Sequence, residues 1–209
     1  MAIAINGSGT VTGISVGGLP DGIVDSDMLA DNAVINQKIT NTTIAEGKLA
    51  ASVDYIRNAD NWQITTSAAM SDGDYFTSNW ERLDVDFGQI GSGMSESSGV
   101  FTFPDAGKWL LMSQWNGYDQ ANNDTSSLGV RHWISTDSGS NYTANLSMYT
   151  NAYGNAGTHW NISGSRIYDV TNASTFRIKF QANLGGDQTF FGNTSFPYCG
   201  VIFIRLGAT

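Results

Sequence analysis

Two histidines, His132 and His159, are the side chains of this sequence that could serve as a catalytic base. His132 shares one face of an expected strand with Val130 and Ile134, which predicts a hydrogen-bonded histidine of the core or of an interface. His159 follows a Gly-rich stretch and is expected in a surface loop, as a contact residue. Triad members converge only in three dimensions, so a hydrolase that uses His159 stays an alternative. No Gly-x-Ser-x-Gly elbow is present, and we expect no enzyme.

Paired acidic residues are the features that most resemble a metal site: Asp25 with Asp27, Asp72 with Asp74, and Asp84 with Asp86. Ca²⁺ requires six or more oxygens, often from one loop, and the segment around Asp72 and Asp74 has two carboxylates with no following Glu. Zn²⁺ requires clustered Cys and His, which the chain lacks. We therefore expect a solvated turn at Asp72 and Asp74, with weak Ca²⁺ binding as the alternative, and no metal or other cofactor.

Aromatic residues lie beside Asn, Gly and Thr in three places: the segments 115–123 and 149–161, and the pair Phe190 and Phe191. Rigid amphipathic rings beside amide groups are typical of recognition loops, although the same rings could cover the flank of an oligomer. Sugars present C–H faces that stack on Trp and Tyr, and hydroxyls that an Asn amide can meet as donor and acceptor. The predicted ligand-binding residues are Tyr118, Tyr153, Trp160, Asn155 and His159.

The composition narrows the class of partner. The net charge of −9 opposes contact with nucleic acid or with an anionic membrane, because phosphates require a surface of Lys and Arg. A neutral glycan or a protein receptor is therefore the expected target. The single cysteine, Cys199, excludes an intrachain disulfide, and its apolar context predicts a buried, inert thiol. No apolar stretch reaches the ~18 residues of a membrane span, and residues 1–6 lack a signal-peptide pattern, so folding in a cytoplasm is expected.

The segment 99–115 organises the predicted fold. Phe101 and Phe103 share one face of a short strand, 104–107 supply a Pro/Gly turn, and 108–115 is apolar like a strand buried on both faces. Other segments alternate similarly, with Gly-rich turns between them and no convincing helix. The further expected strands are 62–66, 82–87, 128–134, 144–149, 165–170, 175–181 and 200–206. Short strands of this number predict an antiparallel β-sandwich.

Residues 21–50 form an internal repeat of three decapeptides. Each has apolar residues at its fourth and ninth positions, and a unit of this size buries them only by stacking or by association with copies of itself. The period of ten rather than seven argues against a coiled coil. The predicted contacts between chains are Val34, Ile39, Ile44 and Leu49.

The repeat resembles the tail-fibre shafts of tailed bacteriophages, in which units like Ala-Val-x-x-x-Lys-Ile/Leu-Ala recur; 33–39 and 43–50 carry this resemblance. It implies a homotrimeric shaft. The preceding segment, 1–20, alternates in places and is expected to pair with other virion proteins as an anchor. A frayed terminus is the alternative for this segment.

Three motifs in 80–209 resemble the jelly-roll head shared by the tumour necrosis factor (TNF) superfamily and the globular head of complement. They are Leu83-x-Val-x-Phe87, Gly99-x-Phe-x-Phe-Pro-x-x-Gly-x-Trp109, and Tyr168-Asp-Val-x-x-x-Ser174-x-Phe-x-Ile-x-Phe. Trp109 stands where that family usually has Tyr. The resemblance implies a trimer whose centre is filled by apolar residues of the inner sheet. In the closing strand, Val201 and Phe203 are the residues expected at this contact.

These features predict an all-β protein. An anchoring segment (1–20) precedes a repetitive trimeric shaft (21–50), a linker (51–61) and an antiparallel jelly-roll head (62–209). We expect a non-enzymatic virion fibre protein of the tail or the capsid, whose homotrimeric head binds a host-surface glycan or protein without inserting into a membrane. A free-standing glycan-binding lectin of the same fold and a capsid decoration protein with no receptor role are the alternatives.

Overall fold

The structure is a computed structural model that describes residues 56–83, 88–119, 125–153 and 157–209. The chain divides into two units, Met1–Ala50 and Ala51–Thr209. The predicted anchor, the shaft and residues 51–55 of the linker lie outside the described residues. The contacts predicted for Val34, Ile39, Ile44 and Leu49 therefore stay predictions.

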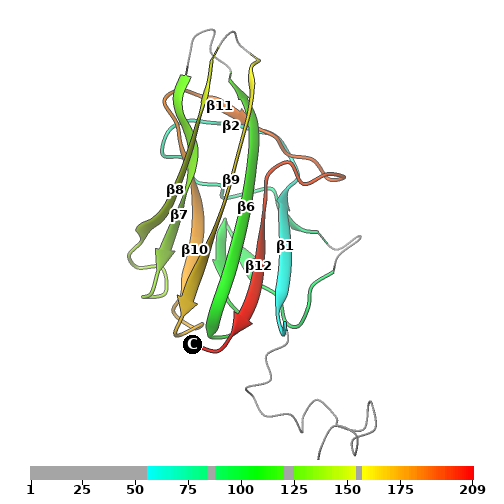
Figure 1. The fold of residues 1–209 in the computed structure, drawn as a ribbon, viewed down its shortest axis with the longest axis vertical. Helices are drawn as coiled ribbons and strands as arrows, with labels where there is room; N and C mark the ends of the chain where they lie inside the picture. Colours follow the sequence, from blue (N-terminus) through cyan, green and yellow to red (C-terminus); the bar gives the residue numbers. More distant parts are fainter. Residues whose placement is uncertain (1–55, 84–87, 120–124, 154–156) are drawn as a thin grey trace, which may run out of the picture. The chain divides into compact units, whose positions relative to one another are not determined.

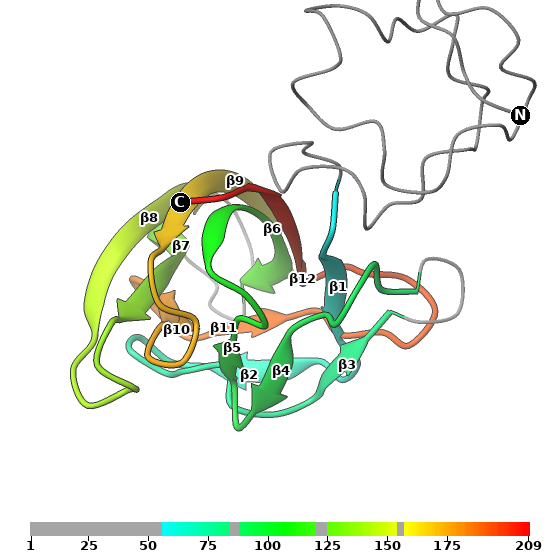
Figure 2. The ribbon, with the colours of Figure 1, turned by 90° about the horizontal axis from the view of Figure 1, so that it is seen from below.

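The described residues form strands and no helix, and hence no helix among them is long and apolar enough to cross a membrane. Two antiparallel sheets face each other (Figures 1 and 2). The seven-stranded sheet contains β1 (Ala59–Ile64), β2 (Ala68–Met70), β3 (Trp80–Arg82), β6 (Gly107–Asp119), β9 (His159–Val170), β11 (Gln188–Phe190) and β12 (Gly200–Gly207). The five-stranded sheet contains β4 (Ser95–Ser97), β5 (Val100–Thr102), β7 (Thr125–Ser135), β8 (Thr143–Ala152) and β10 (Arg177–Asn183).

The long strand β6 organises the seven-stranded sheet. It pairs with β9 along one edge, and with β12 and then β11 along the other. Its side chains alternate, so that Trp109, Leu111 and Trp115 point into the sandwich. From the opposite sheet, Phe180 of β10 meets Trp115 with ring centroids 5.5 Å apart. Burial of a large apolar side chain stabilises the fold by about 1.5–3 kcal/mol, so this aromatic core holds the sandwich together as the sequence predicted.

Val201 and Phe203 do not lie at a surface where they could contact another chain. Both point from β12 into the core, and the Phe203 ring lies 5.3 Å from that of Phe101. Strand alternation places the apolar neighbours Ile202 and Ile204 on the opposite, outer face. The strand is apolar on both faces as predicted, but its inward residues belong to the protomer's own core.

Several strand ends differ from the sequence prediction. Residues 115–118, expected in a recognition loop, continue β6 to Asp119, because β9 and β11 provide hydrogen-bonding partners on both edges. The segment 149–152 likewise completes β8. The expected strand 82–87 is observed as β3 at 80–82, and residues 84–87 lie outside the described part.

Candidate functional site

Tyr118 and His159 lie side by side on the outer face of the seven-stranded sheet. They are directly opposite each other in the antiparallel pair of β6 and β9, and their ring centroids are 6.3 Å apart. Their neighbours Gly117, Asp119 and Trp160 are buried, so alternation turns the two rings outward. The structure therefore brings together two of the residues predicted to bind a ligand.

Phe191 and Tyr198 extend this pair into a larger cluster. Phe191 follows β11, and its backbone N–H donates to the carbonyl of Asn116 on β6 (2.9 Å). Its ring stacks on His159 (5.2 Å between centroids) and lies 5.5 Å from Tyr118 and 5.7 Å from Tyr198. We call Tyr118, His159, Phe191 and Tyr198 the aromatic ladder. The sequence marked Phe190 and Phe191 as an aromatic stretch but did not place Phe191 among the predicted ligand-binding residues, and Tyr198 was missed. Adjacent residues of a strand face opposite sides, so one of Phe190 and Phe191 had to face outward.

The loop that carries Tyr198 is tied to β6. Asn116 Nδ2 donates to the Tyr198 carbonyl, and Gln114 Nε2 donates to that of Pro197. Cys199 is buried next to them, with its Sγ 3.2 Å from the Asn116 carbonyl. Burial raises the pKa of this thiol to about 12, so Cys199 is the inert thiol that the sequence predicted. These bonds hold the backbone of the loop on β6, and the ring of Tyr198 packs against Phe191.

A hollow of about 400 Å³ opens beside the ladder on the same sheet. Gln114 at its wall and Tyr118 of the ladder both point outward from β6, and Pro197 at its rim precedes Tyr198. The hollow is lined by Asn61, Met112, Ser113, Gln114, Ser163, Gly164, Ser165, Pro197, Gly200 and Ile202. Amides and hydroxyls surround an apolar floor, and none of the lining residues is charged. Together with the ladder, this surface suits an uncharged ligand that has both hydroxyl groups and C–H faces.

The other predicted ligand-binding residues are placed differently. Trp160 is in the core, 5% exposed, where its Nε1–H donates to Gln188 Oε1 (2.8 Å). It directly follows the outward His159, and alternation turns it inward, so the prediction that it binds a ligand is wrong. Tyr153 follows β8 and is 67% exposed, with no ring contact to the ladder among the described residues. Asn155 lies outside the described part of the chain, and its role stays a prediction.

His132 is the hydrogen-bonded core histidine that the sequence predicted. Its Nε2 lies 3.0 Å from Ser113 Oγ and its Nδ1 lies 2.9 Å from Tyr168 Oη. Burial, with a smaller effect of the nearby Arg166 charge, lowers the pKa of His132 to about 3. Since Ser113 is only 4% exposed and the imidazole is a very weak base, this Ser–His pair is unsuited to nucleophilic catalysis.

The acidic turn at Asp72 and Asp74 uses its carboxylates to hold the backbone. Asp72 Oδ1 accepts the N–H of Leu184 (2.9 Å), and Asp74 Oδ2 accepts that of Ser71 (2.8 Å). Across the described ranges, no group of three or more His, Cys, Asp or Glu residues could hold a metal ion.

Comparison with known proteins identifies the fold. No protein-family model matches the sequence, and no curated protein matches it. Eiger TNF from S. frugiperda has a similar structure, with a TM-score of 0.55 at 11% identity over 74% of this chain and 96% of that chain. Murine APRIL (TM-score 0.46, 12% identity, 71% and 98% of the two chains) and the globular domain of zebrafish complement 1qA (0.41, 13%, 73% and 98%) also match. The described residues thus form the all-β jelly roll predicted from the sequence, the fold also found in Eiger TNF.

Proposed function

We propose that this protein is a virion fibre protein whose homotrimeric, non-enzymatic head attaches the particle to a host-surface glycan or protein. The observation that carries the binding role is the aromatic ladder beside the uncharged hollow. Exposed rings that already pack against one another, on a loop held by backbone hydrogen bonds, lose less conformational entropy on binding a ligand than free side chains do. Three copies of a weak site on one trimer would add avidity without new contacts.

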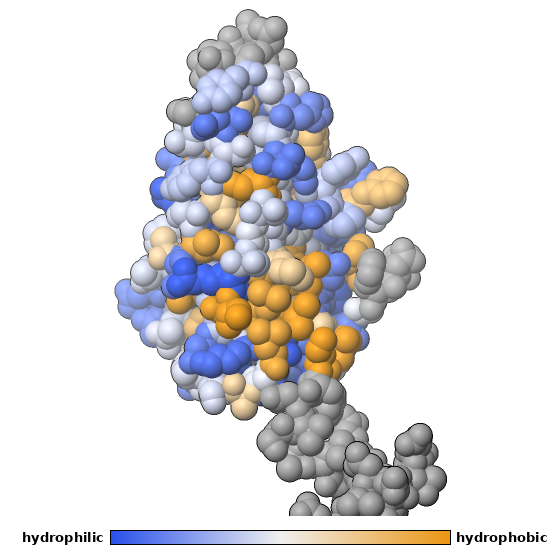
Figure 3. Space-filling model, in the orientation of Figure 1, coloured by the Kyte–Doolittle hydropathy of each residue, from blue (hydrophilic) through white to orange (hydrophobic). Residues whose placement is uncertain are grey.

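An apolar patch on the outer face of the seven-stranded sheet supports assembly with further copies of the chain. Ile204 pairs with Leu110, and Leu110 pairs with Ile167, so these side chains adjoin on one face. Ile167 is 56% exposed. Figure 3 shows this apolar patch in the lower half of the face formed by β6 and β12. A contiguous apolar surface of this kind is typical of a protein–protein interface.

The decapeptide repeat of residues 21–50 supports the fibre role. A free-standing lectin has little need of a segment that buries its apolar residues only by association, and the same repeat resembles phage fibre shafts. Residues 1–20 would then anchor the fibre, and the protein would reside in the virion. A lectin and a decoration protein without a receptor remain the competing interpretations, and the experiment below separates the decoration protein from a receptor-binding head.

The test uses the purified full chain. Light scattering should give three times 22.4 kDa, and the protein should adsorb to cells of a susceptible host within a panel of bacterial strains. Tyr118→Ala and Phe191→Ala should abolish adsorption while the trimer stays intact, whereas Ile90→Ala, which alters an exposed residue outside the ladder, should not. A stable monomer would refute the trimer. Normal adsorption of both ladder variants would refute the assigned site, and failure of the wild type to adsorb to any strain would favour a decoration protein.

A further inference from the structure

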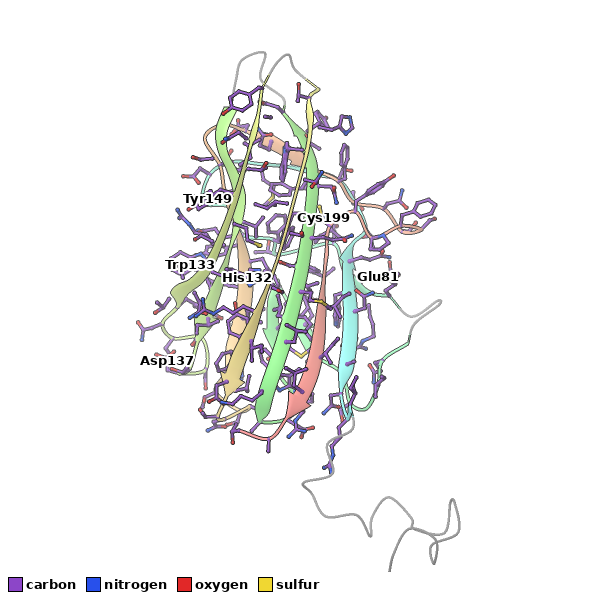
Figure 4. The ribbon with its side chains drawn as sticks, viewed as in Figure 1. Glu81, His132, Trp133, Asp137, Tyr149 and Cys199 are labelled. Atoms are coloured by element: carbon purple, nitrogen blue, oxygen red, sulfur yellow. The ribbon has the colours of Figure 1, made fainter. Side chains whose placement is uncertain are left out.

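The outer face of the five-stranded sheet carries cationic and aromatic side chains that the proposed site does not use. Lys179 of β10 is directly opposite Trp133 of β7, and Gln181 is opposite Arg131. Their neighbours Phe180 and His132 are buried, so alternation turns these side chains outward. Figure 4 shows Trp133 on the side of the molecule formed by β7 and β8, away from Glu81. We call Tyr75, Arg131, Trp133, Tyr142 and Lys179 the cationic strip.

Lys179 is held between two tyrosine rings. Its Nζ lies 3.8 Å from the ring centroid of Tyr75 and 3.9 Å from that of Tyr142. The Trp133 ring meets Tyr75 edge-on at 6.5 Å. The faces of the rings attract the ammonium group through their quadrupoles, but they offer none of the hydrogen-bond acceptors that its three N–H groups can use. The charge is therefore fixed in place and still able to bind an anion.

Arg131 is likewise without a carboxylate partner among the described residues. One of its five N–H groups, on Nη2, donates to Tyr149 Oη (3.2 Å), which leaves donors of the guanidinium available. In contrast, Arg82 pairs with Asp60 and Lys108 pairs with Asp169 on the seven-stranded sheet. In a chain of net charge −9, Arg131 and Lys179 are cations on one sheet face that form no salt bridge among the described residues.

The acidic residues near the cationic strip are engaged in their own loops. Asp137, in the turn after β7, accepts from Ser135 Oγ (2.7 Å) and from the backbone N–H of Asn141 (2.9 Å). Asp74, next to Tyr75, accepts from the N–H of Ser71. Neither carboxylate neutralises Arg131 or Lys179 as an ion pair.

We propose that the cationic strip binds a carboxylated polysaccharide. A carboxylate matches the planar fork of Arg131 and the ammonium of Lys179, and the C–H face of a sugar ring matches the half-buried Trp133. The indole is fixed in orientation because its Nε1–H donates to Gln181 Oε1 (2.7 Å). A neutral sugar could stack on the Trp133 ring, but it would leave Arg131 and Lys179 without a counter-charge. The strip is on the other sheet from the aromatic ladder, and its ligand requires neither the ladder nor the trimer.

Binding of the full chain to carboxylated polymers tests this proposal. The probes are polygalacturonate, alginate and polysialic acid, with fully methyl-esterified polygalacturonate and duplex DNA as controls for charge. Isothermal titration at low salt should show binding to at least one carboxylated polymer and not to the ester. Arg131→Gln and Lys179→Gln should each weaken binding about tenfold, the value of one charge-assisted hydrogen bond. Lys108→Gln, which removes the same charge from the other sheet, should change it by less than about twofold.

Each alternative result has a defined meaning. The proposal is wrong if the wild type binds none of the carboxylated polymers, if the ester or DNA binds equally well, or if Lys108→Gln weakens binding as much as Arg131→Gln. Melting curves and light scattering must show that the variants keep the fold and assembly state of the wild type. If either glutamine variant does not fold, Trp133→Phe, which keeps an aromatic ring, is tested in its place. Its affinity should fall, since the smaller ring loses the bond to Gln181, and an unchanged affinity would exclude stacking on residue 133. Tyr118→Ala should leave binding unchanged, which separates this site from the aromatic ladder.

Discussion

Ser113 Oγ lies 3.0 Å from His132 Nε2, and this hydrogen bond joins the two sheets inside the core. Ser113 belongs to β6 of the seven-stranded sheet and His132 to β7 of the five-stranded sheet. Tyr168 of β9 approaches the second ring nitrogen at 2.9 Å. Both nitrogens of the imidazole are therefore used inside the protein, and burial keeps the ring neutral.

This buried histidine predicts a loss of stability in mild acid. The pKa of His132 is lowered to about 3 from its ordinary 6.5, so between these values the unfolded chain binds a proton that the folded chain does not. The free energy of unfolding should therefore fall as the pH falls through this window, by about 1.4 kcal/mol per pH unit below 6.5. Urea unfolding at pH 7 and at pH 5 measures this change in the free energy of unfolding.

The matched variant for this prediction is His132→Gln, whose amide can hydrogen-bond and does not titrate. Its stability should change less than that of the wild type between pH 7 and pH 5. The range stops at pH 5 because hydrogen bonds from Ser135 and Asn141 lower the pKa of Asp137 to about 2, which adds its own loss of stability below about pH 4. Equal pH dependence in the two proteins would mean that His132 is not the titrating group.

Asp60 should be far more important for stability than the exposed ion pair of the head. Its side chain is fully buried and accepts from Arg82 Nε (2.9 Å), Trp62 Nε1 (2.9 Å) and the backbone N–H of Met94 (2.6 Å). Asp60→Asn leaves Arg82 without its counter-charge and should cost about 3 kcal/mol. Lys108→Gln, which breaks the exposed pair with Asp169, should cost less than about 1 kcal/mol. Chemical unfolding measures the free energy of unfolding of both variants. Equal losses of stability would contradict the larger role given to Asp60.

Adjacent residues of β12 should separate folding from assembly. Phe203 is fully buried, and Phe203→Ala should destabilise the head by about 3–5 kcal/mol through the cavity it leaves. Ile204 points to the outer face, so Ile204→Asp should leave the circular dichroism spectrum unchanged and dissociate the proposed trimer. Light scattering and thermal melting on each variant distinguish the two effects. An intact trimer in Ile204→Asp would place the interface elsewhere.

Alternation in the sequence predicted the strands of the sandwich well, but it did not always show which face of a strand meets the core. In β10 it placed Ile178 and Phe180 inward, where both are fully buried. It could not show which face of the apolar strand 200–206 meets the core, because both faces have apolar side chains, and Phe203 was therefore assigned to the wrong contact.

The extent of the candidate site was equally hard to predict. The sequence predicted a loop at Asn116 and Gly117, yet backbone pairing with β9 and β11 keeps both residues in a strand. Phe191 meets Tyr118, and Tyr198 meets Phe191, only through pairing between segments distant in sequence, which no local pattern encodes.

The last prediction concerns the hollow beside the aromatic ladder. Ser163 of β9 is exposed and opposite Gln114 of β6, so both side chains line the hollow from the outer face of the sheet. An indole at this position would project into the hollow of about 400 Å³ without entering the core. Ser163→Trp should therefore block adsorption to host cells and leave the melting temperature nearly unchanged, while Ser163→Ala should adsorb as the wild type does. Adsorption assays with light scattering on the same samples check both results. If Ser163→Trp still adsorbs normally as an intact trimer, the hollow holds no part of the ligand, and recognition is confined to the exposed rings.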